Sequence, residues 1–250
     1  AFAIIVSVAL LVYWHRRRGF SLAIFAYSFV AYAAAIALKY AVQIPTVDLA
    51  TSYFGRTSVG LGVYYGVQTA FFEVGLAYLV AWYAVKRGHL ARKDAEGYGA
   101  GLAFWENAVL LGALPLVNLV ADYAILSGSS SLSQTVYGLL SGGSAYLFDP
   151  VPRALVLTSL GAVERLSSIL LHTAWGYLCV MAAVLGKRRL FFIALPMGFV
   201  DFFVPFATSI GLAVFEALVF AISLAGVLVA WYATRDAKGE ATRTRASPVV

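Results

Sequence analysis

The sequence has few charged residues and a single cysteine, and each scarcity excludes a class of protein. Only 12% of the 250 residues are charged and 62% are hydrophobic, whereas about a quarter of the residues in soluble domains are charged. A soluble globular domain is therefore excluded, and the chain is predicted to be an integral membrane protein. The one cysteine, Cys179, excludes an internal disulfide and a multi-cysteine metal or cluster site.

Histidine and lysine are missing from places where familiar membrane sites need them. Only His172 of the three histidines falls in an apolar segment, so neither a zinc site with two histidines and a carboxylate nor a bis-histidine haem site is expected. The last apolar segment, 211–234, has no lysine that could form a retinal Schiff base. We therefore expect no cofactor and no metal ion. Asparagine occurs only as Asn107 and Asn118, a scarcity that is typical of thermophilic proteins.

Apolar segments dominate the chain and predict an all-α, polytopic bundle of about seven transmembrane helices. A membrane-spanning helix needs roughly 20 residues, which these segments approach or exceed, whereas barrel strands are about half as long. Pro45 is expected to end the second segment, so that Lys39 lies near its end and reaches the membrane surface. The fifth segment is expected to divide into an interfacial piece before Glu164 and a span after it. The expected segments are 1–14, 20–44, 60–85, 98–123, 153–185, 190–210 and 211–234.

The basic residues predict how the bundle is oriented. Of the 18 Lys and Arg residues, 14 fall in the loops after segments one, three and five or in the tail. Because basic loops stay in the cytoplasm, we expect a multi-pass plasma-membrane protein with its N-terminus outside and its C-terminus inside. The transmembrane domain is expected to cover 1–234, and the polar cytoplasmic tail, 235–250, is expected to be disordered. The expected partners are membrane lipids, transmembrane segments of other proteins or subunits of a membrane complex, and not nucleic acid.

Ionisable residues inside the apolar segments are the strongest functional signal. Such residues are costly at membrane depth and usually face a bundle interior. The stretch 163–185 places Glu164, Arg165, Ser168 and His172 in one helix, where a single polar stripe could carry them. We expect Glu164 to pair with Arg165 or His172. The residues expected to meet near the bilayer midplane are Glu73, Glu106, His172 and Asp201.

Two structural interpretations compete with a functional site. The first is a polar core that only holds the helices together. The second treats single acidic residues near helix ends, such as Glu216, as anchors at the membrane surface. Glu106 is expected to have no cationic neighbour.

Four short motifs carry a family resemblance. Glu164 and Arg165 are followed by His172 eight residues after the glutamate, Asp201 lies in segment six, and FFEVGLAY and GAGLAFWE contain Glu73 and Glu106. With these residues the chain resembles the YhfC-like intramembrane proteases, relatives of the CAAX-prenyl and glutamic-type membrane proteases. It departs from the family pattern at four positions: Leu102 and Met197 replace histidines, and Phe72 and Leu76 replace a glutamate and an arginine.

The resemblance implies a site and a chemistry. In a glutamic-type mechanism Glu106 or Glu73 would activate water, and His172 would orient it or stabilise the oxyanion. The catalytic candidates are Glu106, Glu164, His172 and Asp201, and the binding candidates are Glu73, Arg165 and Ser168.

The departures from the family pattern fall on chemical residues. We therefore expect a catalytically degenerate pseudoenzyme that binds a hydrophobic peptide or a lipid-like ligand. The alternatives are an active glutamic-type intramembrane protease and a structural subunit of a larger membrane complex.

Overall fold

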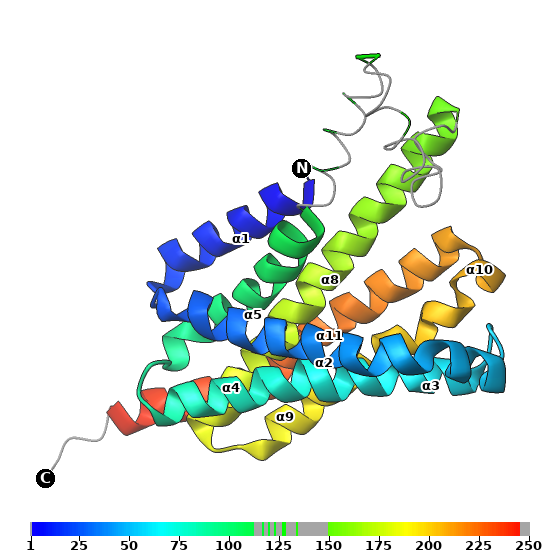
Figure 1. Ribbon diagram of the computed structural model, residues 1–250. Helices are drawn as coiled ribbons and strands as arrows, with labels where there is room; N and C mark the ends of the chain where they lie inside the picture. Colours follow the sequence, from blue (N-terminus) through cyan, green and yellow to red (C-terminus); the bar gives the residue numbers. More distant parts are fainter. Residues whose placement is uncertain are drawn as a thin grey trace, which may run out of the picture.

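The computed structural model is a bundle of long helices (Figure 1). It describes residues 2–112, a few isolated positions between 117 and 134, and residues 150–245. Within these ranges the chain is helical and forms no strands. The expected end of the fourth segment at Tyr123 and the connection 127–149 fall largely outside the described residues. The α-helices are α1 (Phe2–Arg18), α2 (Ala23–Phe54), α3 (Val59–Gln68), α4 (Gly75–Lys86), α5 (Ala95–Phe104), α8 (Val151–Leu185), α9 (Arg188–Ala194), α10 (Ala207–Ile210) and α11 (Leu212–Arg245).

Irregular helical turns join several of these helices into longer rods. The π-helical turn η1 (Thr69–Val74) links α3 to α4, and a second π-helical turn, η3 (Trp105–Leu110), continues α5. The 3₁₀ segment η5 (Leu195–Phe206) connects α9 to α10, and the short 3₁₀ turn η2 (Arg92–Asp94) precedes α5. Among the described residues, four stretches are long and apolar enough to cross a membrane: Ala23–Phe54, Val151–Leu185, Arg188–Ile210 and Leu212–Arg235. The predicted all-helical membrane bundle is confirmed.

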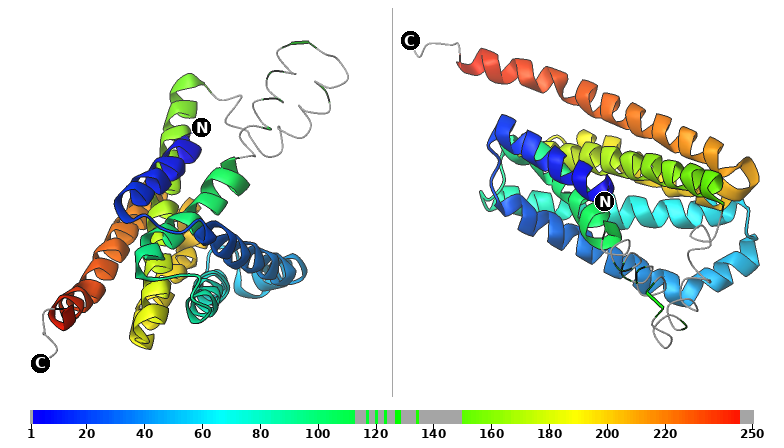
Figure 2. Two further views of the ribbon diagram at one scale, coloured as in Figure 1. Left: turned by 90° about the vertical axis from the view of Figure 1, so that its left-hand side faces the viewer. Right: turned by 90° about the horizontal axis from the view of Figure 1, so that it is seen from above.

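Helix α8 runs through the middle of the bundle. It packs against α4, α5, α9 and α11, and Figure 2 shows α11 lying along one side of it. Its second half contributes Trp175 and Leu178 to the buried core. Large apolar side chains remain exposed on the outer helices, as Ile44 and Leu49 of α2 are. A lipid-facing surface explains this exposure, because the bilayer is itself apolar.

Three boundaries differ from the sequence-based expectation. Helix α2 continues through Pro45 to Phe54 and ends at Gly55, whose φ of 87° suits glycine. Membrane helices tolerate an internal proline because neighbouring groups satisfy the freed carbonyl. Helix α8 is continuous, so the break expected before Glu164 is absent. Helix α11 extends past Thr234 to Arg245, and the division of the chain at residue 234 remains a prediction.

The basic loops gather at one end of the bundle. In Figure 1 the α1–α2, α4–α5 and α8–α9 turns and the C-terminal end of α11 all lie on the left. The α2–α3 and α10–α11 turns lie at the opposite end, on the right. We call these the basic end and the far end. The assignment of the basic end to the cytoplasm remains a prediction.

Candidate functional site

Irregular turns place the two central glutamates. Glu73 lies in η1 and Glu106 lies in η3, and both turns are π-helical. Such π-bulges inside α-helices are often found at functional sites, because the extra residue per turn re-aims side chains and frees backbone groups. His172 comes from the regular part of α8 and is 4% exposed. Three separate rods therefore contribute one ionisable side chain each.

Glycines allow these rods to approach closely. A Cβ atom at Gly176 of α8 would lie 2.5 Å from the Cα of Gly99 in α5, and one at Gly198 of η5 would lie 2.8 Å from the Cα of Ala70 in η1. Larger residues would force the backbones apart, which is why small residues are enriched where membrane helices pack closely. The first contact joins α8, which carries His172, to α5, which continues into the turn of Glu106, and the second joins η5, which carries Asp201, to η1.

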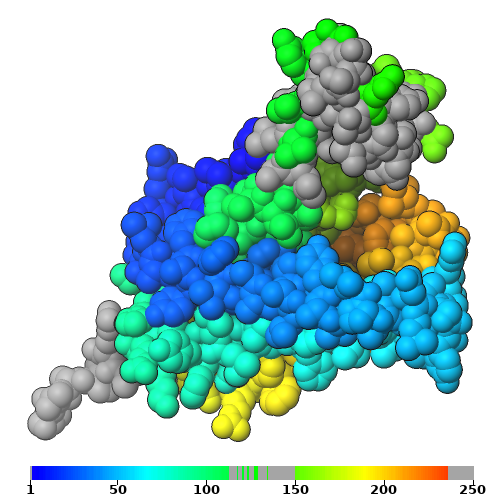
Figure 3. Space-filling view, in the orientation of Figure 1, coloured from blue at the N-terminus to red at the C-terminus, as the bar shows by residue number. Residues whose placement is uncertain are grey.

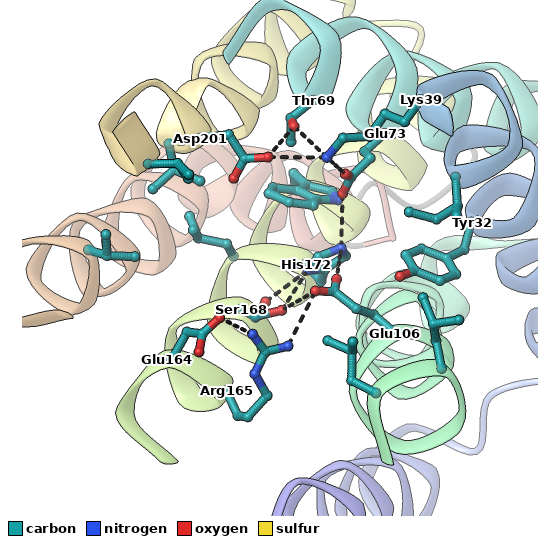
Figure 4. A pocket seen from close by; sticks show the side chains of 18 of the residues that line it. Tyr32, Lys39, Thr69, Glu73, Glu106, Glu164, Arg165, Ser168, His172 and Asp201 are labelled. Atoms are coloured by element: carbon teal, nitrogen blue, oxygen red, sulfur yellow. Dashed lines mark hydrogen bonds and ion pairs between the residues drawn. The ribbon is translucent and has the colours of Figure 1, made fainter. Parts of the chain in front are cut away.

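Glu73, Glu106 and His172 converge on one point, which Figure 4 shows at the centre of the pocket. The Nε2 atom of His172 is 2.7 Å from Oε2 of Glu106 and 3.4 Å from Oε2 of Glu73. One nitrogen or oxygen atom from each of the three residues lies within 4.8 Å of the others. We call these three residues the Glu-Glu-His cluster.

The outer atoms of the cluster already have partners. His172 Nδ1 donates to the main-chain carbonyl of Ser168 at 2.9 Å, which fixes the hydrogen on Nδ1 because a carbonyl oxygen only accepts. Glu106 Oε1 accepts from the Ser168 hydroxyl at 3.1 Å, and Glu73 Oε1 accepts from Lys39 Nζ at 2.6 Å. The inner atoms differ: Glu106 Oε2 and His172 Nε2 are buried, and among the described residues their polar contacts are with other atoms of the cluster, without a well-aligned hydrogen bond.

Lys39 holds one side of the cluster and was missed by the sequence prediction. Its ammonium contacts Glu73, Asp201 at 3.1 Å and the Thr69 hydroxyl at 2.8 Å, and Thr69 also donates to Asp201. The expectation that Lys39 reaches the membrane surface is wrong. It depended on α2 ending at Pro45, and because α2 continues to Phe54, Lys39 lies well inside the helix.

Arg165 holds the other side of the cluster. It forms an ion pair with Glu164, as expected, and its Nη1 atom lies 3.7 Å from Oε1 of Glu106. Nη1 also donates to the side-chain amide oxygen Oδ1 of Asn107 at 3.3 Å, and the Nδ2 atom of Asn107 donates to the Ser168 hydroxyl at 3.0 Å. The expectation that Glu106 has no cationic neighbour is wrong, since both Arg165 and His172 are close to it.

One cavity of about 480 Å³ connects these groups. Its apolar wall includes Ile36, Leu171, Val200 and Phe215. The space-filling view shows α2 and α3 covering the front of the bundle, with the α10–α11 region visible behind them (Figure 3). All seven residues proposed from the sequence line the cavity: Glu73, Glu106, Glu164, Arg165, Ser168, His172 and Asp201. Sequence reasoning missed the lining residues Tyr32, Lys39 and Thr69.

The ion-pair network in this cavity carries excess negative charge. Four carboxylates belong to it, while Lys39 and Arg165 are its permanent cations. With His172 neutral, two negative charges remain. Charges removed from water need compensation, so the network requires either protons or a cation.

Comparison with known proteins identifies the family. A family model described as "YhfC intramembrane metalloprotease" matches residues 2–208. The chain belongs to this family. A protein of Bacillus subtilis (strain 168) named "Uncharacterized membrane protein YhfC" is 27% identical over 201 residues, which cover 77% of this chain and 75% of the relative. No solved structure matches the chain. The match to the family model ends before α11 begins.

The family description implies a metal ion, and the cluster can be tested for its fit. Ligands bound to Zn²⁺ at about 2.0–2.2 Å in a tetrahedron lie a little over 3 Å apart. The 3.4 Å distance from His172 Nε2 to Glu73 matches this separation, whereas the 2.7 Å distance to Glu106 is that of a direct contact, which a bound ion would have to widen. Metal-bound histidines usually donate their second ring N–H to a carbonyl or carboxylate, as His172 does to Ser168. The donor types and the spacing of Glu73 and His172 fit a divalent ion.

Proposed function

We propose that this protein is an intramembrane metallopeptidase in which Glu73, Glu106 and His172 hold one divalent ion. One observation carries the proposal. In each of the three side chains an outer atom is hydrogen-bonded to a neighbouring residue, while an inner atom faces the inner atoms of the other two. The excess negative charge supports the same proposal, because one divalent ion would balance the two uncompensated charges. The substrate would be an apolar peptide segment seated against the apolar wall of the cavity.

The surrounding residues have distinct roles in this proposal. Ser168 orients Glu106 and His172, and Lys39 orients Glu73. A bound divalent ion would supply an activated water and polarise a peptide carbonyl. Arg165 places a positive charge beside Glu106, where it could stabilise negative charge that develops on the peptide oxygen.

The proposal departs from two sequence-based expectations. The expected absence of a metal ion depended on counting histidines, but carboxylates also bind Zn²⁺ and Mn²⁺. Two glutamates beside one histidine provide three donors. The expected loss of activity depended on Leu102 and Met197, which replace family histidines. Both are buried, at 2% and 7% exposure, and neither is among the residues lining the cavity.

A second candidate is a protein that binds a hydrophobic peptide or lipid-like ligand without efficient cleavage. The Lys39 ammonium favours it, because this cation already neutralises part of the charge on Glu73 and Asp201. A metal-free glutamic protease is the remaining enzymatic alternative, with Glu106 activating water beside His172. The structural-subunit alternative has less support, because the polar groups share a cavity instead of forming separate helix contacts.

Cleavage assays separate these candidates. The purified protein in lipid vesicles would be stripped of metal, loaded with Zn²⁺ and incubated with a pool of transmembrane peptides. We expect specific products by mass spectrometry that disappear after chelation and in Glu106→Gln. Glu96→Gln is the matched control, because Glu96 pairs with Arg18 outside the cavity. Cleavage that resists chelation would support the glutamic mechanism. Binding without products would support the second candidate.

A further inference from the structure

Glu216 of α11 is a buried carboxyl group that the proposed mechanism does not use. It lines the same cavity as the Glu-Glu-His cluster, although it lies outside the family match. The residue is only 3% exposed, and its Oε2 atom is buried without a hydrogen-bond partner in the described chain. The expectation that it anchors α11 at the membrane surface does not explain this burial.

No cation of the described cavity wall is available to neutralise Glu216. Lys39 is shared by Glu73 and Asp201, and Arg165 is shared by Glu164 and Glu106. Residues 113–149 contain no Lys, Arg or His, so that stretch of the sequence supplies no basic side chain. An ionisable group at membrane depth is costly without a partner and usually marks a substrate or ion pathway.

Glu164 provides a second carboxylate at the same part of the cavity. It lines the cavity from α8, its side chain is 49% exposed, and its ion-pair partner is Arg165. Helices α8 and α11 pack together, so Glu164 and Glu216 line the cavity from neighbouring helices. Arg165 is already engaged by Glu164 and Glu106.

We propose that Glu216 and Glu164 form a subsite for a positively charged side chain, Lys or Arg, on the substrate peptide. The proposal depends on the peptide substrate proposed above and specifies which peptides are preferred. A substrate ammonium or guanidinium group would give Glu216 the partner that the chain does not provide. Removing one member of a buried ion pair is strongly unfavourable, so peptides without the cation would bind more weakly.

The geometry of α8 sets the position of this cation. Glu164 and His172 are eight residues apart on a continuous helix, which corresponds to about 12 Å along the axis. An extended peptide rises about 3.3 Å per residue. The basic residue should therefore lie about three to five residues from the peptide bond that faces His172, on the side toward Glu164.

A binding experiment tests the subsite without requiring cleavage. The probe is a fluorescent Leu/Ala transmembrane peptide with one Lys, compared with the same peptide carrying Met at that position. The protein would be held in phosphatidylglycerol vesicles, whose headgroups carry no cation. We expect the wild type to prefer the Lys peptide by about tenfold or more. Moving the lysine along the peptide should reveal one preferred position.

Two variants and a control make the result specific. Glu216→Gln should reduce the preference to less than about threefold, and Glu216→Lys should favour a peptide with Glu at the same position. Glu96→Gln should keep the wild-type preference. Equal binding of the Lys and Met peptides by the wild type, or an unchanged preference in Glu216→Gln, would overturn the subsite.

A lipid amine is the competing occupant. If phosphatidylethanolamine vesicles abolish the lysine preference and this lipid remains bound to wild type but not to Glu216→Gln, the occupant is a lipid and the peptide subsite is overturned. A lysine preference without any cleavage would preserve the subsite and refute the metallopeptidase. Cleavage without a lysine preference would preserve the metallopeptidase and refute the subsite.

Discussion

Asp94 is a buried carboxylate and Glu106 is a partly buried one whose Oε2 atom is inaccessible, yet the two belong to different kinds of region. Asp94, 1% exposed, lies near the basic end, and its two oxygens accept from the backbone N–H groups of Ser21 at 2.6 Å and Ala91 at 2.7 Å. Glu106 has one oxygen bound to Ser168 and the other facing His172 without a hydrogen bond. Burial alone therefore does not indicate function.

The two carboxylates differ in how many of their hydrogen-bond partners the surrounding chain supplies. The chain itself supplies every partner that Asp94 needs, so this carboxylate stabilises the junction between η2 and α2. The Glu-Glu-His cluster has satisfied outer atoms and converging inner atoms, two of them without a hydrogen bond. Native structures leave few buried polar atoms unsatisfied. Buried polar atoms that converge beside a cavity without hydrogen bonds therefore indicate a binding site better than burial alone does.

The largest expected difference is in the side of the membrane that each end of the bundle faces. Labelling from outside should be all-or-none. In a Cys179→Ala background, we expect His89→Cys, near Asp94, to resist an impermeant maleimide added to sealed cells. Ser159→Cys, on the exposed first half of α8, should be labelled, because α8 begins at the end of the bundle opposite the basic loops (Figure 1). Labelling of His89→Cys alone would reverse the predicted orientation.

The second-largest expected difference between the two regions is in how substitutions change the affinity for Zn²⁺. We expect His172→Ala and Glu106→Gln to lower Zn²⁺ affinity by at least about 100-fold, since loss of a ligand should exceed the 10–100-fold effect of outer partners. Asp94→Asn should change the affinity by less than about threefold, because its partners are backbone amides. Competition with a chromophoric chelator measures this difference. Similar losses in Asp94→Asn and Glu106→Gln would remove the distinction between the regions.

Thermal stability should depend more on Asp94 than on Glu106, the opposite of what is expected for Zn²⁺ affinity. Asp94→Ala leaves two backbone N–H groups without acceptors, and hydrogen bonds to charged groups contribute about 1.5–3 kcal/mol each. We expect a loss of about 3 kcal/mol or more, seen as a lower melting temperature in detergent. Metal-free Glu106→Gln should melt within a few degrees of the metal-free wild type. A metal-free Glu106→Gln that melts well below Asp94→Ala would show that the cluster is mainly structural.

The smallest expected effect concerns the residue that orients two ligands. Ser168→Ala should weaken Zn²⁺ binding by about tenfold, at the lower limit for outer partners, because the main-chain bond to His172 survives the substitution. Ser159→Ala is the matched control, since the hydroxyl of this serine donates to the Leu155 carbonyl on the exposed part of α8. Equal affinities for the two variants would show that the Ser168 hydroxyl does not orient Glu106.

The sequence predicted much of this architecture because its signals are local. Apolar length indicated the helices, and all seven proposed polar residues line one cavity. The contribution of Lys39 could not be predicted, since it depends on α2 continuing through Pro45, which neighbouring helices permit. The π-helical turns under Glu73 and Glu106 arise from tertiary packing and have no simple sequence pattern. The partners of Glu106 likewise depended on how three rods meet.

The most direct test of the central claim is X-ray absorption spectroscopy of the Zn²⁺-loaded protein in lipid. We expect one ion per chain with nitrogen and oxygen neighbours at about 2.0–2.2 Å, and scattering from a single imidazole. His172→Ala should lose this signal, whereas Asp94→Asn should keep it. A sulfur neighbour at about 2.3 Å, two or more imidazoles, or a signal that survives His172→Ala would contradict a metal site formed by Glu73, Glu106 and His172.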